Sequence, residues 1–380
     1  MTKQRVLLFF STLVIVGVLG TFVSFYARGY RLDFKTLKFQ PNGILVIKSE
    51  PDGASVFIDK ELKTATNATI SLPPGTYDVE VKKEGYFEWY KRLTIEKEIV
   101  TQATVSLFKT APSLSPITFS GAQNPVLSQD GSKLAYIDSE GLWVNDITSL
   151  PLGFSRGPKR VTDGNLVNAT FEFSPDANQI LLTTSNGIFL LDTNTFTAQA
   201  DRVNVASRKS EILVGWQEAQ KLIEEVHLRV LPPQLADVFT RKVSKISFSP
   251  DETMILYTAS ASATLDENLV RPLPGASTQK QERIIKEGQT YVYDIKEDRN
   301  FLIDEVELPV RWMPSSRHLL LAQEDKITVA DYDGTNRQTV YSGSYIYPFA
   351  FPYSNTSKIL ILTNLGSGSS SPNLYSLTIK

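Results

Sequence analysis

Few side chains in this sequence stand in a pattern that performs catalysis. Ser277 and Lys280 have the S-x-x-K spacing of a serine nucleophile with a lysine base, but the companion S-D-N and K-T-G motifs are absent. His227 and His318, the two histidines, have no convergent ligand pattern, and we expect each at the surface or at a strand boundary. Residues 331–336 resemble the start of a calcium loop, yet its twelfth position is a serine. We predict no catalytic residue, no metal ligand and no cofactor.

The composition excludes further classes of site. None of the 380 residues is a cysteine, which rules out disulfides, thiolate metal sites, iron–sulfur clusters and a cysteine nucleophile. The formal net charge is −2, so no general basic field attracts nucleic acid, and we expect no nucleic-acid partner. The 42% hydrophobic and 10% aromatic content supports a large core, and the length suggests two or three domains.

Residues 6–27 carry no charged side chain and predict a membrane-spanning helix. At a rise of about 1.5 Å per residue the run extends about 33 Å, which is enough to cross the hydrocarbon layer. A cleaved signal peptide is the alternative, but its apolar core is shorter than this run. We therefore predict a short tail and uncleaved anchor over 1–31, whose partner is the lipid bilayer, and a linker over 32–42.

The charges that flank the span leave its orientation open. Two basic residues precede it, whereas Arg28, Arg31, Lys35 and Lys38 follow it. The positive-inside rule alone would place the bulk of the chain in the cytoplasm. The free amino group of the five-residue tail adds a positive charge before the span, which reduces the difference in positive charge between its two sides.

Residues 43–109 alternate apolar and polar side chains in short runs, as strands of a half-buried sheet do. Turn residues separate the runs. In one of them, Pro74 sets φ for the first central position and Gly75 supplies the positive φ that a type II turn requires. The pattern predicts a compact β-sandwich.

Two segments of this predicted sandwich resemble the PEGA domain. They are residues 47–59 (IKSEPDGASVFID) and residues 72–79 (LPPGTYDV). Asp52 stands where that family usually has Glu, and Lys60 replaces a common Gly. The resemblance implies a non-catalytic surface or envelope module that is often tethered to a membrane. It implies no transferable active site.

A repeated unit occupies the rest of the chain. Each copy has an apolar strand, a turn related to Ser-Pro-Asp, a second apolar strand and a third strand. One such meander cannot bury both faces, whereas a radial stack of them can. The first strands and turns of the five copies lie at residues 125–131, 171–176, 246–251, 310–315 and 349–353.

These repeats resemble the TolB-like β-propellers, in which strand–Ser-Pro-Asp-Gly–strand units recur. The resemblance covers residues 110–380 and implies a mainly β chain whose propeller has five or six blades. At about 45 residues per blade the length favours six, although only five copies are recognisable. The glycine of the motif survives only as Gly131.

Two insertions interrupt the repeats. Residues 210–231 predict a helix, because Trp216, Ile223 and Val230 belong to an apolar stripe with helical spacing. Ser210 is the expected N-cap, and Pro232 and the proline after it are expected to end the helix. We expect it to close one end of the propeller or to pack on the small domain; a partner-binding helix is the alternative. Residues 260–289 read as a polar loop.

Together these features predict a non-catalytic, membrane-anchored surface or envelope protein. Its propeller would serve as a binding or scaffolding platform for a protein or glycan ligand. One alternative is an extracytoplasmic hydrolase that uses the propeller funnel, which requires a convergent acid–base pair such as two carboxylates. The other is a cytoplasm-facing tethered interaction protein. The family resemblances favour the extracytoplasmic side, and the charge rule favours the opposite side.

Overall fold

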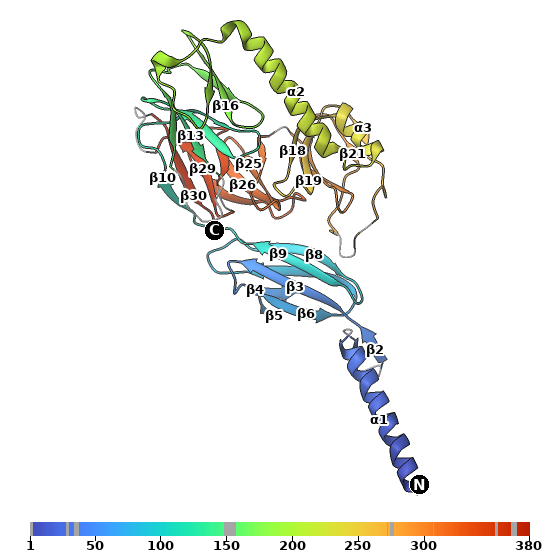
Figure 1. Cartoon of the computed structure of the whole chain (residues 1–380). Helices are drawn as coiled ribbons and strands as arrows, with labels where there is room; N and C mark the ends of the chain where they lie inside the picture. Colours follow the sequence, from blue (N-terminus) through green and yellow to red (C-terminus); the bar gives the residue numbers. More distant parts are fainter. Residues whose placement is uncertain are drawn as a thin grey trace. The chain divides into compact units, whose positions relative to one another are not determined.

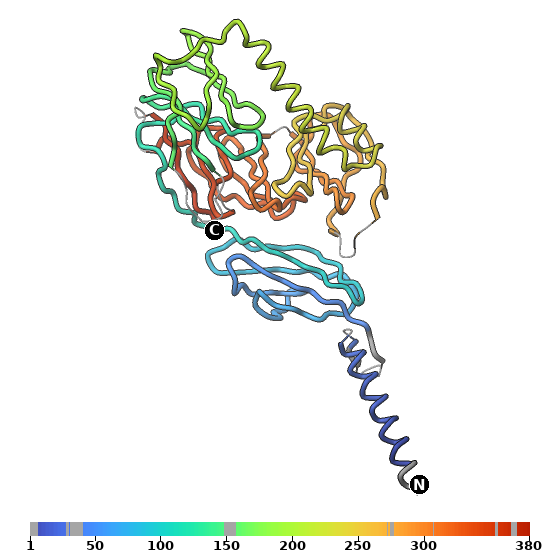
Figure 2. Tube along the Cα trace, viewed as in Figure 1, coloured from blue at the N-terminus to red at the C-terminus, as the bar shows by residue number. Residues whose placement is uncertain are grey.

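A computed structural model describes residues 3–27, 30–33, 38–147, 157–271, 273, 277–306, 308–353, 356–365 and 371–380. The chain divides into two compact units (Figures 1 and 2). Unit 1 comprises Met1–Leu107 with Pro272–Gln279, and unit 2 comprises Phe108–Arg271 with Lys280–Lys380. Each unit is described by itself.

The N-terminal apolar run forms helix α1 (Lys3–Ala27). Its segment Leu7–Ala27 has a mean hydropathy of 2.3, and none of that segment is buried inside the protein. An apolar helix of this length that no protein surface covers is able to cross a bilayer. Signal sequences near an N-terminus share these properties.

The predicted sandwich is present in unit 1 as two facing β-sheets. A hairpin of β1 (Tyr30–Asp33) and β2 (Lys38–Pro41) precedes it. One sheet has the order β6–β3–β9, with β3 and β9 parallel, and the other has the order β5–β4–β7–β8. The strands are β3 (Gly43–Glu50), β4 (Ser55–Ile58), β5 (Glu61–Ala65), β6 (Ala68–Leu72), β7 (Gly75–Lys82), β8 (Trp89–Ile95) and β9 (Val100–Ser106).

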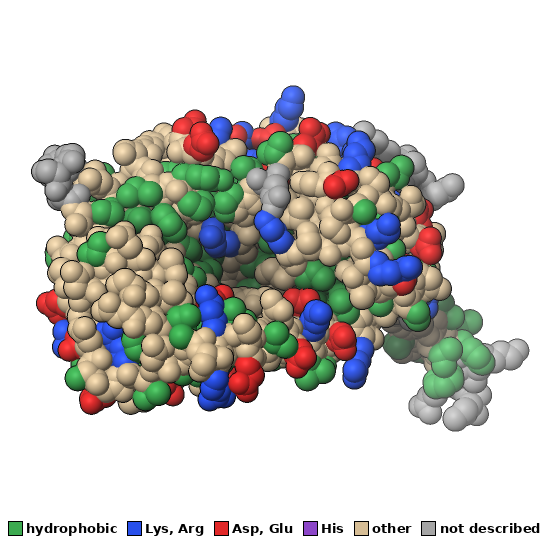
Figure 3. Space-filling view, turned by 90° about the horizontal axis from the view of Figure 1, so that it is seen from above, with side chains coloured by type: hydrophobic (Ala, Val, Ile, Leu, Met, Phe, Trp, Pro, Cys, Tyr) green, Lys and Arg blue, Asp and Glu red, His purple; other side chains and the backbone are tan. Residues whose placement is uncertain are grey.

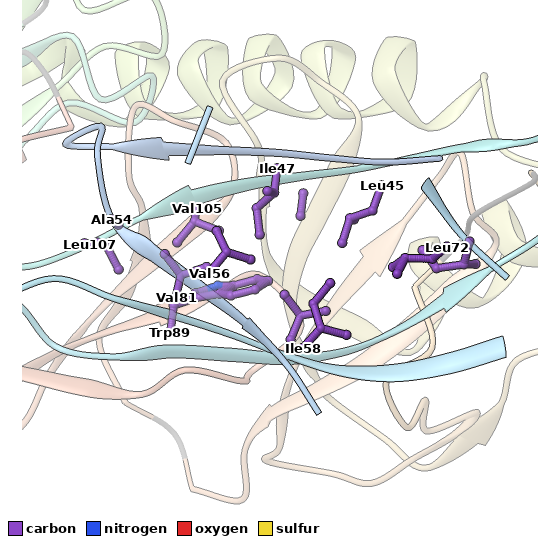
Figure 4. Packing of buried hydrophobic residues seen from close by; sticks show 13 residues of the cluster. Leu45, Ile47, Ala54, Val56, Ile58, Leu72, Val81, Trp89, Val105 and Leu107 are labelled. Atoms are coloured by element: carbon purple, nitrogen blue, oxygen red, sulfur yellow. The ribbon is translucent and has the colours of Figure 1, made fainter. Parts of the chain in front are cut away.

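Alternate residues of these strands form one hydrophobic core between the two sheets (Figure 4). Leu45 and Ile47 of β3 face Val56 and Ile58 of β4, and all four are almost fully buried. Trp89 lies among them with 5% of its surface exposed. The period-2 pattern of the sequence therefore marks the buried face of each strand.

The described part of unit 2 contains five antiparallel sheets of three or four strands, and each includes the strands of one copy of the repeat. The first sheet has β11 (Gln123–Leu127), β12 (Lys133–Ile137), β13 (Gly141–Asp146) and β14 (Lys159–Asp163). The second has β15 (Thr170–Phe173), β16 (Gln179–Thr184) and β17 (Gly187–Asp192). The third has β18 (Val243–Phe248), β19 (Met254–Ala259), β22 (Thr290–Asp294) and β23 (Arg299–Asp304).

The fourth sheet has β24 (Val310–Trp312), β25 (His318–Ala322), β26 (Lys326–Asp331) and β27 (Gln338–Ser342). The fifth has β28 (Ala350–Tyr353), β29 (Lys358–Thr363) and β30 (Asn373–Thr378). Its fourth strand comes from the start of the unit, because β10 (Ser113–Pro116) pairs with β30. This pairing ties the two ends of the unit together (Figure 1).

Neighbouring sheets bury their faces against one another. Shared hydrophobic clusters join the first sheet to the second, the third to the fourth, and the fifth to the first. Hydrogen bonds add to these contacts: Lys133 Nζ donates to the carbonyl of Ala177 (2.9 Å), and Trp312 Nε1 donates to the carbonyl of Ser247 (3.0 Å). Each meander is thus stabilised by its neighbours, as the repeat pattern predicts.

Helices α2 (Lys209–Leu228) and α3 (Pro233–Arg241) follow the second sheet in the chain and precede the third (Figure 1). The predicted helix is therefore present and ends at Leu228, before the two prolines, but its predicted start is wrong. Arg208 occupies the N-cap position, and Ser210 lies inside the helix. Pro232 is the N-cap residue of a second helix, and Pro233 occupies its first helical position, which proline favours.

The predicted polar loop contains a short hairpin of β20 (Ala263–Thr264) and β21 (Ile284–Ile285). A buried ion pair holds the end of the loop, since Arg283 Nη1 lies 2.9 Å from Asp298 Oδ1. Tyr293 donates a hydrogen bond to the same oxygen (2.8 Å), and the backbone N–H of Leu269 donates to Asp298 Oδ2 (2.9 Å). Burial of this carboxylate is offset by these donors.

In four of the repeats, the turn between the first and second strands has a residue with positive φ, although its residue type differs from copy to copy. Gly131 has a φ of +70°, and the equivalent residues Ala177, Glu252 and Ser316 have values of +55°, +57° and +58°. Residues other than Gly adopt this left-handed backbone conformation at a cost of about 1 kcal/mol or more. The turn geometry is therefore maintained even where the glycine of the motif is lost.

We predict that substitution of Leu45 by Ala lowers the free energy of unfolding of the sandwich by about 2–5 kcal/mol, because a fully buried side chain leaves a cavity. The matched control is Leu62→Ala, at a position that is 60% exposed in the same sandwich, and it should change stability by less than about 0.5 kcal/mol. Denaturant unfolding of the full chain in detergent measures both. Equal losses of stability in the two variants would contradict the assignment of Leu45 to the core.

We also predict opposite effects for two Gly→Ala substitutions in unit 2. Gly131→Ala should destabilise it by about 1 kcal/mol, because the new Cβ meets no atom within 4 Å and only the positive φ is unfavourable. Gly215→Ala in α2 also meets no neighbour and should stabilise by up to about 1 kcal/mol, because Ala is the better helix former. Tryptophan fluorescence during denaturant unfolding distinguishes the two signs, and a stabilising G131A would contradict the turn assignment.

Candidate functional site: a central cavity

All five sheets of unit 2 contribute to the lining of one cavity of about 670 Å³, here called the central cavity. The sheets contribute their first strands and the turns that follow, and α2 contributes one side. Figure 3 shows the surface hollowed near its middle, with basic side chains at the margin. The lining includes Asp130, Pro175, Pro250 and Pro314 from the turns of the first four sheets, Pro352 from β28 of the fifth sheet, and Gln220, Ile223, Glu224 and His227 from α2.

The serine and aspartate of each turn hold the lining in place. In the second sheet Ser174 Oγ donates to Asp176 Oδ1 (2.6 Å) and accepts the backbone N–H of Gln179 (2.9 Å). The same carboxylate oxygen accepts the N–H of Asn178 (3.1 Å), two residues further on, as the sequence predicts. The hydrogen bond from Ser174 is the largest cause of the lowered pKa of Asp176. The first and third sheets repeat the set with Ser128 and Asp130, and with Ser249 and Asp251.

In the fourth turn Met313 and Ser315 occupy the positions of this serine and aspartate. A histidine takes the place of the missing hydrogen-bond partner. Ser315 Oγ lies 2.8 Å from His318 Nδ1, and His318 Nε2 lies 3.6 Å from Asp331 Oδ1. His318 is the first residue of β25, in agreement with the expected strand boundary, but it is buried, with only 4% of its surface exposed. Its ring also packs edge-on against Phe108 at 5.3 Å.

Ser315 belongs to this turn, whereas His318 begins β25 and Asp331 ends β26. His318 pairs across the sheet with Asp331, and the same register pairs Lys133 with Asp146 and Gln179 with Asp192. The histidine therefore occupies a structural position of the repeat. It does not border the central cavity.

The carboxylates that line the central cavity already have partners. Asp130 accepts hydrogen bonds from the hydroxyls of its own turn. Glu224 accepts the side-chain amide of Gln220 (2.7 Å), and Glu252 Oε1 lies 3.6 Å from His227 Nε2. A glycosidase-like pair needs two carboxylates that face a reacting atom. Among the described residues no three His, Cys, Asp or Glu side chains could hold a metal ion.

His227 attaches α2 to the wall of the cavity. Its ring lies 4.6 Å from the ring of Phe248, on β18, at an interplanar angle of 31°. Its Nδ1 lies 2.7 Å from the carbonyl of Ile223, one turn earlier in α2. Ile223 of the apolar stripe lines the cavity, whereas Val226 and Val230 of the same stripe are 51% and 67% exposed.

The sequence did not single out the residues that give the cavity its character. Phe248 and Trp312 are the aromatic side chains of its walls, and Arg311 is its arginine. Arg311 lies in the middle of a first strand, where the other copies have Glu172, Ser247 or Ala350. The sequence feature that could have drawn attention to Arg311 is a charged residue between two apolar ones on such a strand. Its place in the cavity could not be predicted, because the direction of the side chain depends on how the sheets pack.

We predict that His227→Ala loosens α2 and accelerates amide hydrogen exchange over residues 220–228 by about tenfold, which corresponds to roughly 1.4 kcal/mol of local stability. The ring contact with Phe248 and the ion pair with Glu252 are both lost. Lys221→Ala, an exposed position on the same helix, is the control and should leave the rate unchanged. Equal exchange in the two variants would contradict the attachment through His227.

Comparison with known proteins identifies the small domain. The family model of the PEGA domain matches residues 42–111, which include all strands of the sandwich. No curated protein matches the chain.

Several solved structures resemble the chain at low identity. The structure of putative TolB from Agrobacterium tumefaciens is 13% identical, with a TM-score of 0.24, over 66% of this chain and 76% of that one. TolB from Acinetobacter baumannii is 11% identical, with a TM-score of 0.24, over 80% of this chain and 59% of that one. The AfRom2 CNH domain is 10% identical, with a TM-score of 0.30, over 70% of this chain and 98% of that one. The chain thus contains a PEGA domain, as its sequence indicates, and TolB proteins are among the solved structures similar to it.

Proposed function

We propose that this protein is a membrane-anchored, non-catalytic binding protein whose ligand occupies the central cavity of unit 2. The observation that carries the proposal is the convergence of four turns, strand β28 and helix α2 on a single cavity of about 670 Å³. Ligand sites are usually concave, mostly apolar and provided with a few polar groups. This cavity has apolar and aromatic walls, and its carboxylates are engaged with neighbouring side chains.

The membrane part of the proposal is supported by α1. Its apolar side chains are exposed along the whole segment Leu7–Ala27, and a bilayer would bury them. We place units 1 and 2 on the extracytoplasmic side, where the ligand would be an envelope protein or a glycan. The PEGA domain supports this side, and the four basic residues after the span oppose it.

Because the chain has no cysteine, one introduced cysteine is a unique chemical label. We predict that Glu218→Cys, at an exposed position of α2, reacts with a membrane-impermeant maleimide on intact cells. Thr2→Cys, before the span, should react only after the cells are opened. The reverse pattern would place the bulk of the chain in the cytoplasm, and a full-length chain in the soluble fraction would contradict the anchor.

Ligand binding is tested with a photoreactive amino acid in the full-length protein in its own cells. At Gln220, which lines the central cavity, we predict a discrete cross-linked product. At Gln217, which is exposed on the same helix and does not line the cavity, we predict none. Products at Gln217 but not at Gln220 would place the ligand on the outer surface and contradict the proposal.

A further inference from the structure

The end of unit 2 opposite to the central cavity carries exposed apolar side chains. The central cavity lies where the first strands of the sheets end, so the connections that lead into those strands lie at the other end. Four such connections precede β11, β15, β24 and β28, and we call the end that they form the connection end. Each of them exposes a large apolar side chain, which is Phe119, Val167, Val306 and Ile346 in turn.

Phe119 lies on a loop that is held on both sides of it. The side chain is 83% exposed, more than any other large apolar side chain described in unit 2. Asn373 Oδ1, from β30, accepts the hydroxyl of Thr118 (3.0 Å) and the backbone N–H of Gly121 (3.0 Å). The hydroxyl oxygen of Thr118 in turn accepts the N–H of Leu374 (2.9 Å). Because the loop is already fixed to β30, a contact through Phe119 loses little further conformational entropy.

The connection end also contains a cavity of about 420 Å³, here called the side cavity. It is bordered by Leu308 and Pro309, which lead into β24, and by Tyr347, which leads towards β28. Leu256 and Val310 add apolar walls. A cavity of this volume is within the range of ligand pockets and has room for a phenyl ring.

We propose that two copies of this protein pair through their connection ends, and that Phe119 of each copy enters the side cavity of the other. A single exposed apolar side chain is ordinary, but here the exposed ring and a cavity of suitable size lie at the same end of one unit. A two-fold interface requires such self-complementarity, because both copies contribute the same surface. Lys245 and Arg311 also border the cavity, and the face of an aromatic ring attracts neighbouring cations.

The pairing moves exposed apolar surface out of water, which is the main source of stability in protein association. It leaves the central cavity of each copy accessible, because that cavity lies where the first strands end and the connections lie where they begin. The proposal does not depend on the proposed function. Two copies can pair whether or not a ligand occupies the central cavity.

The first test measures the mass of the full chain in detergent by sedimentation at several protein concentrations. We expect a reversible dimer. Phe119→Ser should raise its dissociation constant at least about tenfold, because truncation of a buried aromatic anchor usually costs more than 1 kcal/mol. The unfolding temperature of the diluted protein should not change, because the side chain is exposed in the single copy.

Val226→Ser is the matched control for this measurement. It removes an exposed apolar side chain from α2, which borders the central cavity, and should leave the dissociation constant unchanged. A chain that stays monomeric at every concentration would overturn the proposal. A dimer that F119S leaves intact would overturn it too, since association through α1 alone gives that result.

A second test probes the contact itself, and it uses single introduced cysteines because the chain has none. Ser120→Cys lies next to Phe119, and Glu305→Cys lies at an exposed position of the connection that leads to the side cavity. When copies with these changes and different affinity tags are mixed, we expect a short bismaleimide to join them. Glu218→Cys on α2 replaces Glu305→Cys in the control mixture and should not be joined to Ser120→Cys. Equal or absent cross-linking in the two mixtures would overturn the proposal.

Discussion

The hydrogen bond from a turn serine to the aspartate two residues later is the interaction on which the arrangement of unit 2 depends. In three sheets the distance between Ser Oγ and Asp Oδ1 is 2.6–2.7 Å, and the same serine accepts the N–H that begins the second strand. In these three sheets the bond fixes the direction in which the first strand ends. The turns of four sheets and β28 of the fifth line a shared cavity. The fold and the candidate site are consequences of the same local geometry.

Sequence patterns predicted the helices and strands well, but they predicted turn conformations and the burial of single side chains less well. Period-2 alternation identified the strands of the sandwich, because it reflects which side of a strand is buried, and self-similarity around the Ser-Pro-Asp turn identified those of the repeats. The left-handed residues Ala177, Glu252 and Ser316 could not be predicted from their types, because none is a residue that favours such a φ. The burial of His318 was also missed, since it follows from a substitution at Ser315 and from the cross-sheet pairing with Asp331.

The helical insertion shows why amphipathic spacing does not determine what a helix contacts. Its apolar stripe is largely exposed, whereas the side that lines the cavity carries Gln220, Glu224 and His227. The estimate of six blades from chain length assumed that every residue belongs to a sheet. The described part of unit 2 has five sheets of three or four strands, and α2 with α3 occupies much of the chain between the second and third. The second sheet is the one with three strands.

The central claim is that the turns of four sheets, strand β28 and helix α2 surround a ligand. The most direct measurement is an experimental structure of the full chain isolated from its own membranes without exchange of bound molecules. The account predicts an occupant in the central cavity in contact with the turns of several sheets and with α2. A cavity that holds only water, with a partner seated elsewhere on unit 2, would contradict it.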